Sequence, residues 1–235
     1  MARSAKQPSE PSIASKLEDA ILADPDDDAA YLVYADWLLA QNDPRGELIV
    51  LQHQAEEADG ARRAKLRRTA SQFLESHATY FLGPLHERSK GRKYEDDARY
   101  EAHWRTGYVR RLELDWSRSG AYDPDLVCKE LAAILEHPSF RFVLDLQLGP
   151  VFFHSRYADV QEVVATLVAI RRPEALRTLS LGHTSVSDVS TGTADFGALT
   201  ATLGQLRKIT LRERNFDRAK PSDKVHEMTI RRRRS

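Results

Sequence analysis

Cysteine is nearly absent from this chain, which has one, Cys128, in 235 residues. A single thiol excludes an internal disulfide framework. No apolar run approaches the roughly 20 residues that cross a bilayer, and the first residues, MARSAKQPSEPS, lack the apolar core of a signal peptide. We therefore expect a protein of the reducing cytoplasm.

Net charge is also absent, because 35 lysines and arginines balance 35 aspartates and glutamates. Only local patches could then attract a polyanion, so the overall charge neither favours nor excludes nucleic acid. Hydrophobic residues make up 41% of the chain and charged residues 30%. These values are ordinary for a globular protein that buries a core.

The common motifs of catalysis and cofactor binding are missing as well. The chain has no glycine-rich phosphate loop, no dinucleotide fingerprint and no nucleophile elbow. Its eight histidines include no pair three or four residues apart, so no zinc cluster is predicted. Cys128 lies on an apolar helix face, where a small core residue is commoner than a reactive thiol. We predict no catalytic residue, no cofactor and no metal site.

Four helices are predicted over residues 12–85, after a flexible polar leader over residues 1–11. Ser12 and Ser15 both fit as the cap of the first helix. Aspartates at 26–28 fit the start of the second, whose apolar stripe we assign to Leu32, Ala35, Leu38 and Leu39. Asp43 followed by Pro44 begins the third, and the fourth ends at Gly83-Pro84.

A dense group of polar and aromatic residues joins the second and third helices. Its members are Tyr34, Asp36, Trp37, Asp43, Pro44, Arg45, Gly46 and Glu47. A catalytic interpretation needs a nucleophile or metal nearby, and the segment contains neither cysteine nor serine. A structural role explains more: Asp36 would pair with Arg45, Trp37 would anchor the helix pair, and Gly46 would allow close approach. The packed helix pair could itself be a binding surface.

The second half of the chain contains a repeat. YVRRLELDW, FVLDLQLGP, ALRTLSLGH and QLRKITLRE superpose as apolar-x-x-apolar-x-apolar, with middle residues Leu112, Leu146, Leu179 and Ile209 spaced by 34, 33 and 30. Helical patterns lie between them. One strand and one helix per unit is the pattern of a leucine-rich repeat, although the asparagine or cysteine after the strand is missing. We predict an α/β protein: a four-helix cap, a charged linker over 86–103, a short solenoid over 104–215, and a basic tail over 216–235.

The segment ILADPDDDAAYLVYADWLLAQNDPRGELIVLQ resembles the bacterial repeat-companion domain, a helical module marked by Y-A-D-W-L and D-P-R-G-E. The resemblance covers residues 12–85 and extends weakly into HWRTGYVRRLEL. It implies a helical module followed by leucine-rich-like repeats. It implies no reaction, because the members of this family resemble interaction modules.

Outward strand positions are the usual recognition surface of a solenoid. We assign to that surface Arg110, Arg111, Glu113, Asp145, Gln147, Arg177, Thr178, Ser180, Arg207, Lys208 and Thr210. This set is mixed and mostly basic, which favours an acidic protein surface as the partner. Trp104, Trp116, Phe152 and Phe153 are candidate anchors at its edge, with core packing as the alternative.

We therefore predict a non-enzymatic adaptor or scaffold that binds another protein, as a subunit of a larger complex. The alternative is a nucleic-acid-binding accessory subunit that uses the basic face and the arginines at 231–234. No aromatic residue is interleaved with that tail to stack on bases. The other basic run, RRAKLRR at 62–68, reads as a solvated helix face. An enzyme with a site built from distant residues is a third hypothesis.

Overall fold

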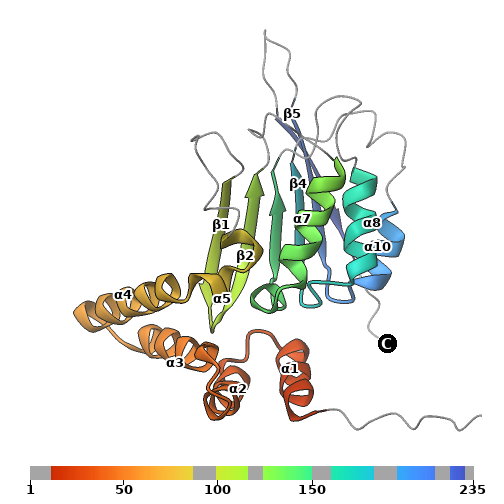
Figure 1. Ribbon diagram of the computed structural model, residues 1–235. Coiled ribbons are helices and arrows are strands. Elements are labelled where there is room, and N and C mark those ends of the chain that lie inside the picture. Colours follow the sequence, from red (N-terminus) through yellow and green to blue (C-terminus); the bar gives the residue numbers. More distant parts are fainter. Residues whose placement is uncertain are drawn as a thin grey trace, which may run out of the picture. The chain divides into compact units, whose positions relative to one another are not determined.

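The computed structural model describes residues 12–86, 99–115, 124–149, 160–182, 195–214 and 223–230. The chain divides into two compact units, Met1–Ala70 and Ser71–Ser235, here called unit 1 and unit 2. The division falls inside a helix, 15 residues before the predicted boundary at residue 85. Unit 1 is helical, and unit 2 combines helices with a sheet (Figure 1).

Unit 1 contains α1 (Ile13–Ala23), α2 (Asp28–Ala40), α3 (Pro44–Glu57) and most of α4 (Gly60–Ser76). Each of the first three helices begins at a side chain that caps it. The Ser12 hydroxyl accepts from the backbone N–H of Ser15, and the carboxylates of Asp27 and Asp43 cap α2 and α3 in the same way. Ser12, rather than Ser15, is thus the cap of the first helix.

The buried face of α2 differs from the predicted stripe. Tyr31, Tyr34, Ala35 and Leu38 are buried, whereas Leu39 is 45% exposed. The prediction considered aliphatic residues alone. Tyr31 and Tyr34 are buried at this face, whereas Leu32 is only partly buried and Leu39 is exposed. A tyrosine packs its ring in the core while its hydroxyl bonds outward, as Tyr34 does to the Glu18 carboxylate at 2.8 Å.

The described helices of unit 2 include the end of α4, α5 (Ala78–Leu82), α7 (Pro124–Glu136), α8 (Val160–Ile170) and α10 (Phe196–Thr202). The predicted fourth helix is therefore interrupted at His77. Its strands are β1 (Arg99–Arg105), β2 (Tyr108–Asp115), β3 (Asp145–Leu148), β4 (Thr178–Gly182), β5 (Lys208–Arg214) and β6 (Asp223–Thr229). A 3-10 turn, η1 (Pro138–Phe140), precedes β3.

All six strands form one mixed sheet in the order of the sequence. The four central strands are parallel, and β1 and β6 add antiparallel at the two ends. The register pairs Leu112 with Leu146, Leu146 with Leu179, and Leu179 with Ile209. These are the residues that the sequence repeat superposes, so the alignment of the four strands is confirmed.

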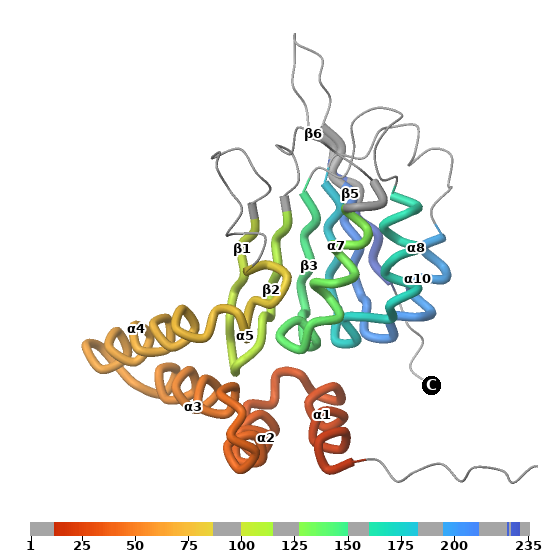
Figure 2. The backbone as a smooth tube through the Cα atoms, in the orientation of Figure 1, coloured from red at the N-terminus to blue at the C-terminus, as the bar shows by residue number. Residues whose placement is uncertain are grey.

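Helices α7, α8 and α10 lie along one face of the sheet (Figure 2). Their apolar residues and the inward strand residues form one continuous core, which includes Leu131 on α7, Val163 on α8 and Leu199 on α10. Leu112, Leu146, Leu179 and Ile209 are each at most 1% exposed. No described helix is both long and apolar enough to span a membrane.

The sequence analysis missed both antiparallel strands. Residues 99–103 were assigned to a charged linker, but they belong to β1; residues 223–229 were assigned to a basic tail, but they form β6. Residues 100–104 alternate apolar and polar residues, as in Tyr100-Glu101-Ala102, and this period of two is the pattern of a half-buried strand. High charge obscured it there. Residues 223–229 show no such alternation, so periodicity could not have predicted β6.

Candidate functional site on the open face of the sheet

The sheet face opposite α7, α8 and α10 carries polar side chains in two rows that cross all six strands. We call this surface the open face. One row is Glu101, Glu113, Gln147, Ser180, Thr210 and Glu227, and the other is His103, Arg111, Asp145, Thr178, Lys208 and Thr229. Each position alternates with an inward apolar residue, which places both rows on one side of the sheet.

Most of these side chains are partly or well exposed. The exposed fraction is 65% for Glu101, 31% for Asp145 and 53% for Glu227. Thr210 is the exception, with 9% of the residue exposed. These polar groups are therefore accessible to a partner, and the core residues need not move for a partner to reach them.

Charge is concentrated at the two ends of the open face. At the β1–β3 end, the Arg111 guanidinium contacts the carboxylates of Glu113 at 2.5 Å and Asp145 at 3.7 Å. At the other end, the Lys208 ammonium lies 2.6 Å from the Glu227 carboxylate. Between these pairs the rows contain only neutral hydrogen-bonding side chains.

Three of the predicted recognition arginines do not belong to the open face. Arg110, Arg177 and Arg207 each precede an open-face residue by one position, so they share the alternation of the inward leucines. Backbone hydrogen bonds link Arg110, Leu144, Arg177 and Arg207 in that order, at the edge where the parallel strands begin. The N–H donor and the carbonyl oxygen are 2.8 Å apart in each bond. Arg110 is only 9% exposed. The error came from treating both residues between the first two apolar positions as outward.

Within the two described rows, the predicted excess of basic charge is not found. Without the three edge arginines, the described open face has Arg111 and Lys208 as its basic residues. The strands that the sequence analysis missed add Glu101 and Glu227, which join Glu113 and Asp145. In these two rows, carboxylates thus outnumber permanently charged cations.

Trp104 packs against the core rather than forming part of either row. It is partly buried, and its ring meets that of Phe81 edge-on at a centroid distance of 5.8 Å. This is the core-packing alternative considered for that residue. Trp116, Phe152 and Phe153 lie outside the described residues. Cys128 is partly buried against the same core, as expected for a small apolar residue.

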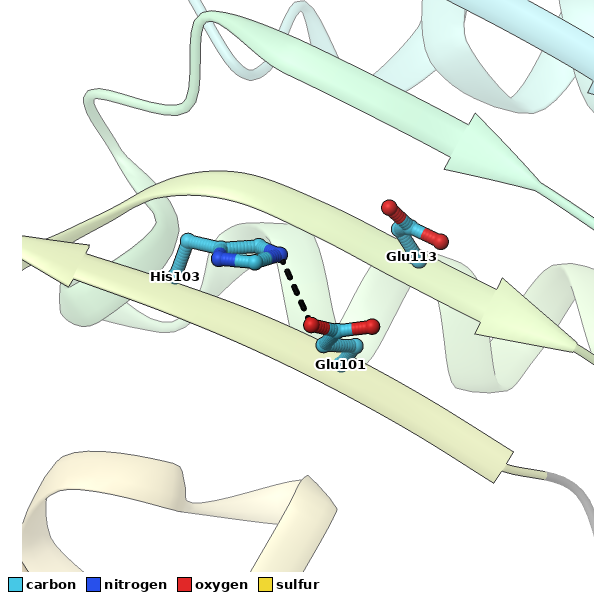
Figure 3. A group of neighbouring side chains, drawn as sticks. All are labelled: Glu101, His103 and Glu113. Carbon is cyan, nitrogen blue, oxygen red and sulfur yellow. Dashed lines mark ion pairs between the residues drawn. The ribbon is translucent and has the colours of Figure 1, made fainter.

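The first two strands bring together a group of possible metal ligands. Glu101 and Glu113 are directly paired across β1 and β2, and His103 is two residues from Glu101 on the same face (Figure 3). One ligand atom from each lies within 4.8 Å of the others. The imidazole Nε2 of His103 lies 3.1 Å from the Glu101 carboxylate. The search for helical spacing of histidines missed this group because it is formed by strand pairing.

In unit 1, the turn between α2 and α3 has the helix cap and the close approach predicted for it. Asp43 accepts from the backbone N–H of Arg45 at 2.8 Å, and Pro44 is the first residue of α3. Gly46 lies against α2: a Cβ atom there would be 2.8 Å from the Ala35 carbonyl oxygen and 2.9 Å from the Leu39 nitrogen. Gly46 therefore lets the two helix backbones approach closely.

The predicted ion pair between Asp36 and Arg45 is not formed. Asp36 is exposed, while Arg45 is only 3% exposed, so the two side chains lie in different environments. Trp37 stacks on Tyr34 of the same helix, with ring centroids 5.8 Å apart, so its expected role as an anchor between the two helices stays a prediction. Glu47 lies in the first turn of α3, where its negative charge interacts favourably with the positive end of the helix dipole.

The comparisons with known proteins find no match: no family model, no curated protein and no solved structure is similar to this chain. The resemblance to the repeat-companion domain stays a prediction from residues 12–85. Function must then be argued from the geometry of the open face.

Proposed function

We propose that this protein is a non-enzymatic adaptor that binds another protein through the open face. In this proposal unit 2 is a short leucine-rich-repeat-like solenoid, and unit 1 is a helical module of the repeat-companion type. The observation that carries the proposal is the open face itself: two polar rows cross six strands, opposite a face covered by helices.

The strand register supports the solenoid. Equivalent residues of the four repeats pair with one another, and the strands follow in sequence order. The first apolar residue of each repeat is fully buried: Val109, Val143, Leu176 and Leu206. Such one-directional stacking, in which each unit buries a face against the next, is typical of repeat proteins.

The composition of the open face favours a particular partner chemistry. Its neutral centre, with Gln147, Thr178 and Ser180, can donate and accept hydrogen bonds. In its two described rows carboxylates outnumber permanent cations, so charge complementarity favours a partner segment that carries lysine or arginine. This replaces the acidic partner expected from the sequence. The same excess of carboxylates would repel the phosphates of a nucleic acid.

The proposal is tested by capture from cell extract with the tagged full-length protein, with and without nuclease. One variant, Gln147→Arg with Ser180→Arg, places bulk and positive charge at the centre of the open face. The matched control, Ala133→Arg with Ala169→Arg, places the same charges at exposed positions of α7 and α8. Near-ultraviolet circular dichroism shows that each variant is folded.

We expect a partner present in equal amounts to the bait, resistant to nuclease, whose capture falls at least ~10-fold with the open-face variant, as expected for steric and electrostatic mismatch at an interface centre. The control variant should capture it normally. Equal capture by both variants would exclude the open face as the binding surface. Loss of capture after nuclease treatment would favour the nucleic-acid alternative, which uses the tail at 231–234, outside the described residues.

A further inference from the structure

We propose that Glu101, His103 and Glu113 form a binding site for a divalent transition-metal ion, with Zn²⁺ as the probe. This site goes beyond the adaptor function, and its existence does not depend on a protein partner. It lies at the β1–β2 end of the open face (Figure 3).

The strand register explains why the three ligands converge. Glu101 and Glu113 are a directly opposed pair on antiparallel strands, so their Cβ atoms lie close together on one face. His103 follows Glu101 by two residues, which returns it to the same face. Ligands held on paired strands keep their relative positions better than ligands on a loop.

The distances suit a small metal ion. Zinc bonds of 2.0–2.2 Å in tetrahedral geometry separate neighbouring ligand atoms by roughly 3.3 Å. The Nε2 of His103 and a Glu101 oxygen are already 3.1 Å apart. The Glu113 oxygen completes a group within 4.8 Å, so a modest change in the rotamers of Glu101 and His103, which are exposed, would close the site.

The local charges also favour a divalent cation. Two carboxylates directly opposite one another across a strand pair repel each other, and a cation between them would relieve that cost. Arg111 contacts Glu113 and Asp145, so it holds the Glu113 carboxylate in place, as the hydrogen-bonded partners of metal ligands commonly do. The carboxylates of Glu101, Glu113 and Asp145 carry three negative charges and the Arg111 guanidinium carries one positive charge. With His103 neutral, the net charge of this group is negative.

The ligand types point to the class of metal. An imidazole nitrogen suits zinc, cobalt, nickel or copper, whereas calcium and magnesium prefer sites made of oxygen alone. Three protein ligands leave a further position for water. We therefore expect Zn²⁺ and Co²⁺ to bind, and Mg²⁺ not to compete.

Unit 1 provides a matched control. His53 and Glu57 lie one helical turn apart, and the His53 Nε2 is 3.4 Å from the Glu57 carboxylate. This pair resembles the Glu101–His103 pair in residue type and distance. The described ligand groups of three or more do not include it. Removing His53 therefore tests whether any histidine beside a glutamate would bind the metal ion as well as His103 does.

The experiment is calorimetric titration of the full-length protein with Zn²⁺ at neutral pH, together with the visible spectrum of added Co²⁺. Co²⁺ absorbs much more strongly in a four-coordinate site than when hydrated by six waters, so its spectrum reports the geometry. The variants are His103→Ala, Glu101→Gln and Glu113→Gln, with His53→Ala as control. Circular dichroism confirms that each is folded.

We expect one Zn²⁺ per chain and a four-coordinate Co²⁺ spectrum, with binding unchanged in the control variant. Each of the three site variants should weaken Zn²⁺ binding by more than about 10-fold, the smallest loss that removal of even an outer-shell partner causes. Absence of saturable Zn²⁺ binding would overturn the proposal. So would binding that survives His103→Ala, because the ligands would then lie elsewhere in the chain.

Discussion

The two units of this protein are stabilised in different ways. Unit 1 relies on contacts between residues near each other in sequence: capped helix starts, the stacked rings of Tyr34 and Trp37, and the close approach of α3 to α2 at Gly46. Unit 2 relies on leucines about 30 residues apart that meet in the strand register. Its core is continuous from α7 to α10.

The difference shows where each unit is vulnerable. In unit 2 the inward residues of neighbouring strands share one core, so a cavity there weakens several contacts at once. In unit 1 a helix start depends on one cap or one glycine. Loss of that residue lowers the free energy of unfolding by less than a cavity in unit 2 does. Charge differs as well: residues 1–70 contain 13 acidic and nine basic residues, whereas residues 71–235 contain 22 acidic and 26 basic residues.

Tryptophan fluorescence can follow the two units separately. Trp37 is the tryptophan of unit 1, and Trp104 and Trp116 belong to unit 2. A chain with Trp37→Phe reports unit 2, and a chain with Trp104→Phe and Trp116→Phe reports unit 1. Each mutation below is measured in both backgrounds against its own parent.

Leu146→Ala should have the largest effect. Leu146 is fully buried at the centre of the row that joins the four repeats, and its truncation leaves a cavity that costs about 2–5 kcal/mol. Urea denaturation followed by the unit 2 tryptophans measures the loss. The adjacent open-face change Gln147→Ala should stay within about 0.5 kcal/mol. Equal losses for the two substitutions would contradict the assignment of inward and outward positions.

Gly46→Ala should have the next largest effect, this time in unit 1. Its new methyl group would lie 2.8–2.9 Å from atoms of Ala35 and Leu39, two of which belong to the α2 backbone. Overpacking of this kind costs about 1–3 kcal/mol, and urea denaturation followed by Trp37 should detect it.

Gly197→Ala in α10 is the matched control, because its nearest neighbour, at 3.2 Å, is a side-chain oxygen of Asp195. Alanine stabilises a helix interior by about 0.5–1 kcal/mol relative to glycine, and at Gly197, the second residue of α10, this gain is an upper limit. A destabilisation by Gly197→Ala as large as that of Gly46→Ala would show that close packing at Gly46 is not the cause.

Much of this fold could be predicted from periodicity. The four repeats, their alignment and the three intervening helices all follow from the spacing of apolar residues, because only one strand register places every leucine inward. The cap at Asp43 and the close approach at Gly46 were predictable too, since each depends on a residue with a specific backbone role.

The errors lie where sequence carries no local signal. Whether Asp36 reaches Arg45 depends on the rotation of α2, which its tyrosines set. To place Arg177 and Arg207 correctly, the alternation of side chains along each strand had to be considered together with the apolar pattern. The group of Glu101, His103 and Glu113 required the pairing of β1 with β2, which no spacing within one strand determines.

Asp43→Ala should have a smaller effect than Gly46→Ala. The Asp43 carboxylate caps α3 through the N–H of Arg45, and loss of such a cap typically costs about 1 kcal/mol. Asp36→Ala is the control, because Asp36 is exposed and lies within α2. Denaturation followed by Trp37 should separate the two aspartates. Similar losses for both would mean that total acidic charge, rather than the cap, controls unit 1.

Glu227→Gln should have the smallest effect, and it tests the end of unit 2 where the repeats stop. Glu227 on β6 pairs with Lys208 on β5 at 2.6 Å, with side chains 53% and 40% exposed. An exposed pair contributes at most about 1 kcal/mol, and salt weakens it. The difference in unfolding free energy from the parent should therefore shrink as sodium chloride rises from about 0.05 to 0.5 M. A salt-independent loss would mean that Glu227 acts by packing. In that case β6 would be a structural cap on the last repeat, and its side chains would not be free to serve the open face.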